Sequence, residues 1–218
     1  PRSQSPDGQW SAFIKDHNVG IRNVETEEEI LLTDDGTEEN AYDVRFYWSP
    51  DTTRLVVLRT RQGDERTVYL IESSPENQLQ PKLHEMSYRK PGDQIPISEP
   101  HLFDIEDRCH ITIPDELFPN PWSISDLRWS PDSRRFTFLY NQRGHQVLRI
   151  VAVDAATGKP RTIVDERSET FIDYAGKRFS YHVEDANEII WMSERDGWNH
   201  LYLYDADAGC VKNQITRG

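Results

Sequence analysis

The chain has 218 residues, enough to bury a hydrophobic core of ordinary size, so neither disulfides nor metals are needed to explain its folding. Of its residues 36% are hydrophobic and 29% charged, and 6 Trp, 9 Tyr and 8 Phe are spread along its length, which indicates a β-rich globular protein. The net charge of −13, without any cluster of Lys or Arg, excludes nucleic acid as a favoured partner.

Cysteine content and hydropathy limit further the class of protein to which this chain can belong. The only cysteines, Cys109 and Cys210, are far apart and have neither zinc-site nor disulfide-scaffold spacing. No apolar run approaches the roughly 18 to 20 residues that span a bilayer, and the first residues contain no apolar signal core. We therefore expect no membrane span here, and either a removed targeting segment or a sequence that starts inside a larger protein.

A turn followed by an apolar strand recurs along the chain. Ser-Pro-Asp begins at positions 5, 49 and 130, and each copy leads into a strand-like run such as residues 55–58 or 136–139. Pro presets φ at the second position of a turn and Asp supplies turn chemistry, so each copy predicts a β-hairpin. Alternating apolar residues before the second and third turns mark the incoming strands.

The third unit predicts a complete four-stranded sheet. An incoming strand is followed by further strands at 135–140, 146–153 and 161–164, with polar turns between them. A degenerate fourth unit without the Ser-Pro-Asp turn repeats this order over residues 178–215. Four antiparallel strands of this length are typical of a β-propeller blade, whereas a β-sandwich is the alternative all-β fold.

The spacing of the turns, 44 residues and then 81, shows that one unit is enlarged, because a blade needs about 40 to 50 residues. A Pro- and Ser-rich insertion at residues 73–93 explains this better than an unrecognised blade. We therefore predict about four blades in one domain. They cover residues 1–33, 42–113, 122–164 and 170–216. Because propellers close with about four to eight blades, we expect an incomplete ring whose unpaired strand edges favour self-association.

Two segments carry a family resemblance. The run at residues 191–205, which contains Arg-Asp-Gly-Trp, and the earlier Tyr-Arg-Lys-Pro-Gly-Asp at 88–93 are similar to segments of dipeptidyl peptidase IV-like serine peptidases of the prolyl oligopeptidase family. This resemblance implies an N-terminal propeller that precedes a catalytic α/β-hydrolase domain. None of the eleven glycines lies in a Gly-x-Ser-x-Gly nucleophile elbow, so we expect the catalytic domain to be absent and this chain alone to be inactive.

The resemblance also implies a substrate site. Family members carry a Glu-Glu pair whose carboxylates accept hydrogen bonds from the free ammonium group of the peptide, and Glu38 and Glu39 are the candidates here. An aromatic residue that should follow the pair is replaced by Asn40 and Ala41, so a solvent-exposed acidic turn is the alternative interpretation. The insertion at 73–93 is a second candidate, because excursions from such blades help to build the dimer contact or the cavity wall.

The histidines do not predict catalysis or metal binding. His84-Glu85 lacks a second histidine four residues after His84, so no zinc-helix motif forms and we expect no metal and no cofactor. His200 has no serine partner and is interpreted as a hydrogen-bonded structural residue, and we expect Trp198 to pack between blades.

The resemblance thus implies the substrate-gating and N-terminus-orienting propeller of an exopeptidase that releases N-terminal dipeptides, often after Pro or Ala. Its partners would be peptides with a free N-terminus, the C-terminal hydrolase domain and a second copy in a homodimer. The parent protein would be periplasmic, extracellular or in the cell envelope. The alternative is a free-standing propeller that serves as an interaction scaffold, since fold does not fix function.

Overall fold

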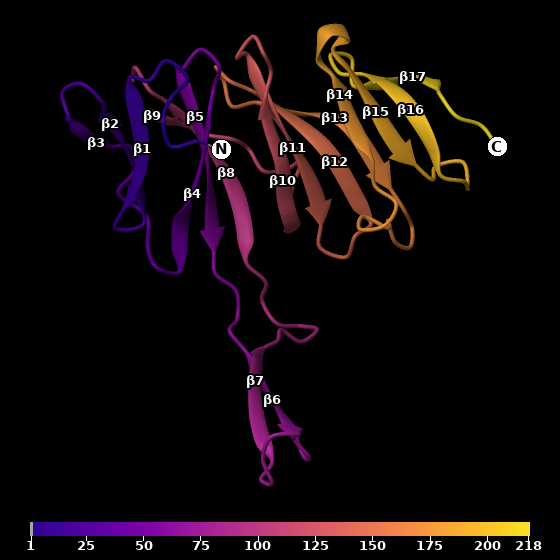
Figure 1. Cartoon of the computed structure of the whole chain (residues 1–218). Helices are drawn as coiled ribbons and strands as arrows, with labels where there is room; N and C mark the ends of the chain where they lie inside the picture. Colours follow the sequence, from indigo (N-terminus) through magenta and orange to yellow (C-terminus); the bar gives the residue numbers. More distant parts are fainter. Residues whose placement is uncertain (1) are drawn as a thin grey trace.

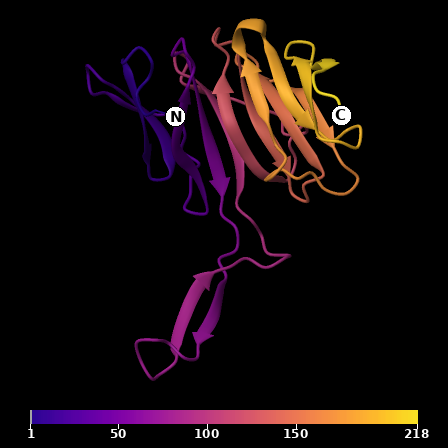
Figure 2. The ribbon, with the colours of Figure 1, turned by 45° about the vertical axis from the view of Figure 1, so that its right-hand side comes forward.

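The computed structural model describes residues 2–218, whose regular secondary structure consists of β-strands and one short 3₁₀ helix, η1 (Glu184–Ala186). Four antiparallel sheets follow one another along an open arc, and a separate two-stranded ribbon projects from it (Figure 1). Seen from a second direction, the sheets stand face to face as successive blades (Figure 2). The chain is thus an all-β propeller fragment, as the repeated turns predicted. Nowhere in residues 2–218 is there a helix that is long and apolar enough to span a membrane.

The first two blades differ in size. The first contains β1 (Trp10–Lys15), β2 (Asn18–Asn23) and β3 (Glu29–Leu31). The second has the order β4-β5-β8-β9 and is built from β4 (Asn40–Trp48), β5 (Arg54–Arg61), β8 (Ile97–Asp104) and β9 (Cys109–Ile111). Pairing between β5 and β8 runs without interruption from Arg54–Asp104 to Arg61–Ile97, so residues 62–96 leave the sheet and return to it.

This excursion is wider than the insertion at 73–93 that the sequence predicted. It contains its own ribbon, β6 (Thr67–Glu72) paired with β7 (Lys82–Ser87), which we call the arm. The polar residues at 73–81 form only the tip of the arm. The sequence pattern did not predict β6 and β7 as strands. The arm extends well away from the blades (Figure 1).

The third and fourth blades each have four strands in sequence order. The third contains β10 (Pro121–Trp129), β11 (Arg135–Gln142), β12 (Val147–Asp154) and β13 (Pro160–Arg167). The fourth contains β14 (Ser180–Val183), β15 (Glu188–Ser193), β16 (His200–Asp205) and β17 (Cys210–Gln214). Between β14 and β15, η1 occupies the place of the Ser-Pro-Asp turn and ends at Asn187 in a left-handed conformation.

Ser-Pro-Asp turns reverse the chain by the same hydrogen bonds in each copy. The Ser49 hydroxyl donates to Asp51 Oδ1 at 2.7 Å and accepts from the backbone N–H of Arg54 at 2.9 Å. The Ser130 hydroxyl donates to Asp132 Oδ1 at 2.6 Å in the same way. These bonds satisfy polar groups that the tight turn takes away from the strand ladder. All of these turns lie at one end of the blades, which we call the turn end. The arm leaves from the opposite end of the blades, which we call the arm end.

Hydrophobic cores fill the space between neighbouring blades. One joins the first and second blades around Val19, Ile21 and Phe103, and another joins the second and third around Val56, Leu102 and Phe136. The last joins the third and fourth blades around Trp191. Burial on both faces explains why the residues of β12 before Asp154 are apolar on both faces, apart from Arg149. The blades therefore form a rigid scaffold that fixes the loops at both ends.

Candidate functional site

Glu38 and Glu39 occupy the tip of a tight turn at the arm end, directly before β4. The backbone N–H groups of Thr37 and Asn40 each donate to the other residue's carbonyl, at 3.2 and 3.1 Å, which closes the turn around the pair. Both glutamates are exposed, and neither side chain forms an ion pair within residues 2–218. The Glu39 carbonyl accepts a hydrogen bond of 2.7 Å from the N–H of Gln62, the first residue of the excursion that carries the arm. The acidic pair is therefore tied to the root of the arm.

The loop that leads to this turn is held by the first blade. Asn18 Oδ1 accepts from the Gly36 N–H at 2.7 Å and from the Thr33 hydroxyl at 3.0 Å. Gly36 passes so close to the His17 carbonyl that a Cβ atom there would lie 2.1 Å from its oxygen, which only glycine allows. Two exposed carboxylates thus project from a backbone whose position is fixed, and such preorganisation favours binding of a cation.

Beneath the turn lies a cluster of polar and aromatic side chains that sequence reasoning missed. Arg59 Nη1 donates to Asp35 Oδ2 at 2.6 Å, the Tyr42 hydroxyl donates to Asp35 Oδ1 at 3.2 Å, and the Arg59 guanidinium lies 5.1 Å from the centroid of the Tyr42 ring. Burial and the neighbouring Asp35 charge raise the pKa of Tyr42 to about 12, so its hydroxyl remains a donor at neutral pH. Because Arg59 is engaged by Asp35, it leaves the charges of Glu38 and Glu39 free.

Two histidines continue this cluster on β8 and β9. The rings of His101 and His110 stack with centroids 5.0 Å apart, and a hydrogen bond of 3.1 Å joins His101 Nδ1 and His110 Nε2. Burial, together with His110 and Arg59, lowers the pKa of His101 to about 4, so this ring is neutral at pH 7. The neutral His101 ring packs edge-on against the Tyr42 ring, with their centroids 5.2 Å apart, and so adds no positive charge to the cluster.

The arm exposes apolar side chains on both of its faces. Tyr69, Ile71 and Leu83 lie on one face and are 61 to 71% exposed, and Leu70 and Met86 lie on the other. Its root is fixed to the third blade by a hydrogen bond of 2.9 Å from Arg143 Nη2 to the Asp93 carbonyl. An isolated two-stranded ribbon is marginally stable in water, so the arm is suited to being covered by another surface.

The Arg-Asp-Gly-Trp segment has a structural role that its sequence did not disclose. The Arg195 guanidinium lies 4.5 Å from the centroid of the Tyr202 ring, and its Nη2 donates to Glu166 Oε2 at 3.0 Å. Buried Glu166 also accepts from Trp191 Nε1 at 3.2 Å and from the Ser193 hydroxyl at 2.7 Å. The motif arginine therefore fastens the fourth blade to the edge strand of the third.

The prediction that Trp198 packs between blades is wrong. Gly197 has a φ of +95°, and the side chain of Trp198, which follows it, is 76% exposed at the arm end.

His200 behaves as a structural residue: a contact of 3.3 Å joins its Nδ1 to the Thr216 hydroxyl. His84 lies on the arm, where its Nε2 is 2.9 Å from Glu72 Oε2. Across the part of the chain that the structure describes, no group of three or more His, Cys, Asp and Glu side chains could hold a metal ion.

Comparison with known proteins supports a specific family. Residues 2–218 match the family model described as the dipeptidyl peptidase IV N-terminal region. A probable dipeptidyl-aminopeptidase B of Pyrenophora teres f. teres is 23% identical over 192 residues, which are 75% of this chain and 21% of that protein. Dipeptidyl peptidase 4 of Trichophyton rubrum is 27% identical over 194 residues, which are 83% of this chain and 24% of that protein. The chain spans less than a quarter of the length of these two fungal proteins.

Solved structures agree with this result at the level of fold. The crystal structure of Porphyromonas gingivalis dipeptidyl peptidase 4 matches all of this chain and 32% of its own, with a TM-score of 0.70 and 20% identity. That of a putative dipeptidyl aminopeptidase IV from Bacteroides ovatus matches 98% of this chain, with a TM-score of 0.63 and 18% identity. Sequence and fold together show that this chain belongs to the dipeptidyl peptidase IV N-terminal region family, the β-propeller portion of dipeptidyl peptidase IV-like serine peptidases.

Proposed function

We propose that this chain is the propeller segment that admits peptides to an exopeptidase and orients their N-termini, so that dipeptides, often ending in Pro or Ala, are released. Serine chemistry would take place in a C-terminal α/β-hydrolase domain of the same protein, outside these residues. Such a peptidase would act on peptides in the periplasm, in the cell envelope or outside the cell. Membership of the dipeptidyl peptidase IV family supports the reaction class.

The observation that carries this proposal is the pair of unpaired carboxylates at Glu38 and Glu39. They are consecutive residues of a turn whose backbone is held by hydrogen bonds to Asn18 and from Gln62, and Arg59, beneath the turn, is bound to Asp35. A peptide ammonium group has three N–H donors, and two carboxylates offer enough acceptors for all of them. Binding at this point fixes how far the substrate enters, which selects cleavage after the second residue.

The test replaces both carboxylates in a longer chain that continues into the downstream coding sequence. Glu38→Gln and Glu39→Gln preserve side-chain size and remove the charge. Because hydrogen bonds to charged groups contribute roughly 1.5 to 3 kcal/mol, we expect kcat/KM for a chromogenic Ala-Pro or Gly-Pro amide to fall roughly 10- to 100-fold per substitution, mainly through KM.

The matched control is the double substitution Glu27→Gln and Glu28→Gln, in the exposed turn between β2 and β3 at the turn end, which should leave activity unchanged. An N-acetylated substrate, which lacks the ammonium group, should be insensitive to Glu38 and Glu39. Activity that survives both glutamine substitutions would refute the assigned site. If the longer chain has no peptidase activity at all, the propeller is an interaction scaffold instead.

We further propose that the arm forms the contact of a homodimer. The support is the apolar, exposed ribbon of β6 and β7, whose two faces would otherwise remain in water. The cross-strand pair Ile71 and Leu83 is 71% and 61% exposed, and a second copy of the arm offers a surface of matching apolar character.

Charge introduced into this pair should separate the subunits. We expect Ile71→Glu and Leu83→Glu to convert a dimer into a monomer in analytical ultracentrifugation, because each places a charge in an apolar contact. Val24→Glu, at an exposed position of 48% in the first blade, is the control and should leave the dimer intact. A wild-type protein that sediments as a monomer at all concentrations would contradict the proposal.

A further inference from the structure

One arginine holds both ends of the turn that carries the two candidate glutamates. Arg59 lies on β5 directly opposite Tyr42 of β4, at the arm end of the second blade. Its Nη2 donates to the carbonyl of Asp35, which precedes the turn, at 2.5 Å. Its Nε donates to the carbonyl of Asn40, the last residue of the turn, at 3.3 Å. A single guanidinium therefore joins the backbone before the acidic pair to the backbone after it.

The guanidinium is itself held in one orientation. Its Nη1 donates to Asp35 Oδ2 at 2.6 Å, and the other oxygen of that carboxylate accepts from the Tyr42 hydroxyl at 3.2 Å. The N–H of Tyr42 donates to the His17 carbonyl at 3.2 Å, which ties the tyrosine to the first blade. A planar guanidinium with donors on all three of its nitrogens can make these bonds together, whereas the point-like ammonium of a lysine cannot.

Arg59 shapes the acidic turn without forming an ion pair with it. The ion pair of Arg59 is with Asp35, and in residues 2–218 no Lys or Arg forms an ion pair with Glu38 or Glu39. The side chain of Arg59 is only 15% exposed, whereas both glutamates are exposed, so the guanidinium lies beneath the turn and the carboxylates lie on its solvent side. Arg59 thus fixes the backbone that carries the two carboxylates.

We propose that Arg59 is a positioning residue of the substrate site. By joining Asp35 to Asn40 it fixes how the two glutamates between them meet the ammonium group of a peptide. This inference rests on the proposed function, because it gives Arg59 a role in the reaction only if the glutamates bind substrate. Carboxylates that are preorganised lose less conformational freedom on binding than carboxylates on a mobile loop. Loss of Arg59 should therefore weaken substrate binding and leave the chemical step, which takes place in another domain, nearly unchanged.

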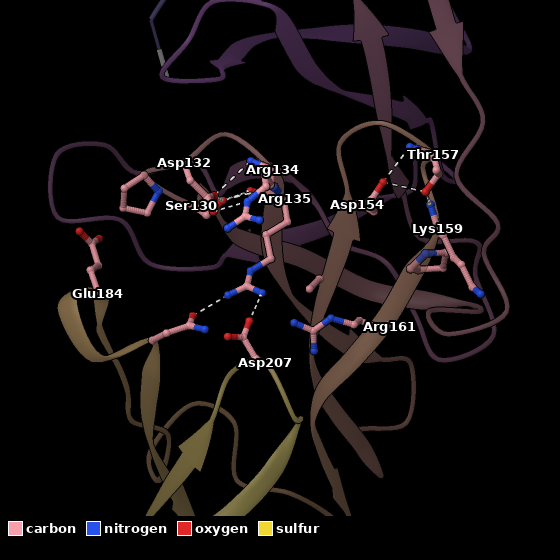
Figure 3. A pocket seen from close by; sticks show the side chains of 14 residues that line it. Ser130, Asp132, Arg134, Arg135, Asp154, Thr157, Lys159, Arg161, Glu184 and Asp207 are labelled. Carbon is pink, nitrogen blue, oxygen red and sulfur yellow. Dashed lines mark hydrogen bonds and ion pairs between the residues drawn. The ribbon is translucent and has the colours of Figure 1, made fainter.

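Steady-state kinetics of the longer chain used for the glutamate substitutions test this role with a chromogenic Ala-Pro amide. Arg59→Lys keeps the positive charge beside Asp35 and removes the forked donor geometry. We expect KM to rise about three- to tenfold, as for the loss of one hydrogen bond, and kcat to change less than about twofold. The matched control is Arg135→Lys at the turn end, where a second arginine donates to Asp207 Oδ1 and Asn187 Oδ1, both at 2.5 Å (Figure 3). Its KM should equal that of the wild type.

A double-mutant cycle separates positioning from a general effect on the fold. If Arg59 acts through the glutamates, Arg59→Lys should not raise KM further in a protein that already carries Glu38→Gln and Glu39→Gln. An equal rise in KM with and without the glutamates would overturn the inference. If the glutamine substitutions raise KM but Arg59→Lys does not, the inference fails and the proposed function stands. If the glutamine substitutions leave KM unchanged, both fail.

Tyr42→Phe provides a second variant in case Arg59→Lys does not fold. It keeps the buried ring and removes only the hydroxyl that donates to Asp35. We expect KM to rise about twofold and the amides of Thr37 and Asn40, which close the turn, to exchange hydrogen faster than in the wild type. Wild-type KM together with wild-type exchange at these amides would contradict the role assigned to the cluster.

Discussion

At the scale of single residues, the cluster beneath the acidic turn shows how burial sets a charge state. His101 is neutral because burial, His110 and Arg59 all disfavour its protonated form, while Asp35 favours that form only weakly. His182, on β14, has its pKa lowered to about 4 for a similar reason, through burial and Arg128. Both rings accept a proton more readily in the unfolded chain, where the ordinary pKa of histidine is about 6.5.

This difference predicts a loss of stability in acid. Between pH 6.5 and pH 4 the unfolded chain binds protons that the folded chain does not, so the free energy of unfolding falls as the pH is lowered across this window. Above pH 6.5 the contribution of the two histidines is fully present. We expect the urea midpoint to decrease from pH 7 to pH 5 and the decrease to be smaller in His101→Gln. His84→Gln, on the arm, should keep the wild-type slope; equal slopes in all three proteins would refute the explanation.

At the scale of elements, the Ser-Pro-Asp turn works together with the tryptophan before it. Trp48 Nε1 donates to the Ser3 carbonyl at 3.0 Å, and Trp129 Nε1 donates to the Tyr47 carbonyl at 2.9 Å, so each indole bonds to the preceding blade. The Asp51 N–H also donates to the Ser133 hydroxyl at 3.0 Å, which joins the turns of two blades. The repeated unit therefore forms one blade and also joins it to the one before.

Trp129→Phe tests this connection. It removes the indole N–H and leaves the Tyr47 carbonyl without that partner, so we expect a loss of roughly 1 to 3 kcal/mol in the free energy of unfolding, measured by urea denaturation. Trp198→Phe makes the same chemical change at a side chain that is 76% exposed and should shift stability by no more than about 0.5 kcal/mol. Equal losses in both variants would show that the hydrogen bond to the neighbouring blade contributes nothing.

At the scale of the whole molecule, the third blade is one of the two inner blades of the arc. Residues of β11 and β12 belong both to the core shared with the second blade and to the core shared with the fourth. The arm contributes to none of these cores and is exposed along its length. Local stability should therefore decrease from the third blade to the arm.

Hydrogen exchange can follow this gradient. We expect the slowest amide exchange in β11 and β12 and the fastest in β6 and β7 when the protein is dilute. At high concentration, exchange in the arm should slow selectively if a second copy covers it, while the blades remain unchanged. Equal protection of arm and third blade in the dilute protein would contradict the gradient.

The sequence by itself determined the fold class, the repeated turn-and-strand unit and the family. These are encoded locally, because turn residues and the alternation of apolar side chains act over a few neighbouring positions. The spacing of the turns also showed that one unit was enlarged, whereas Glu38 and Glu39 became candidates only through the family resemblance. Local reasoning misplaced Trp198, since the direction of a side chain after a glycine with positive φ depends on where the next blade lies.

Only the tertiary structure decided which distant residues meet. Arg59 and Asp35 are 24 positions apart, Arg195 and Glu166 are 29 apart, and Arg135 and Asp207 are 72 apart, yet each pair forms a direct contact. No local sequence pattern predicts such pairs, because they come into contact only when the chain folds and its segments pack together. The support beneath the acidic turn and the junction of the last two blades both arise in this way.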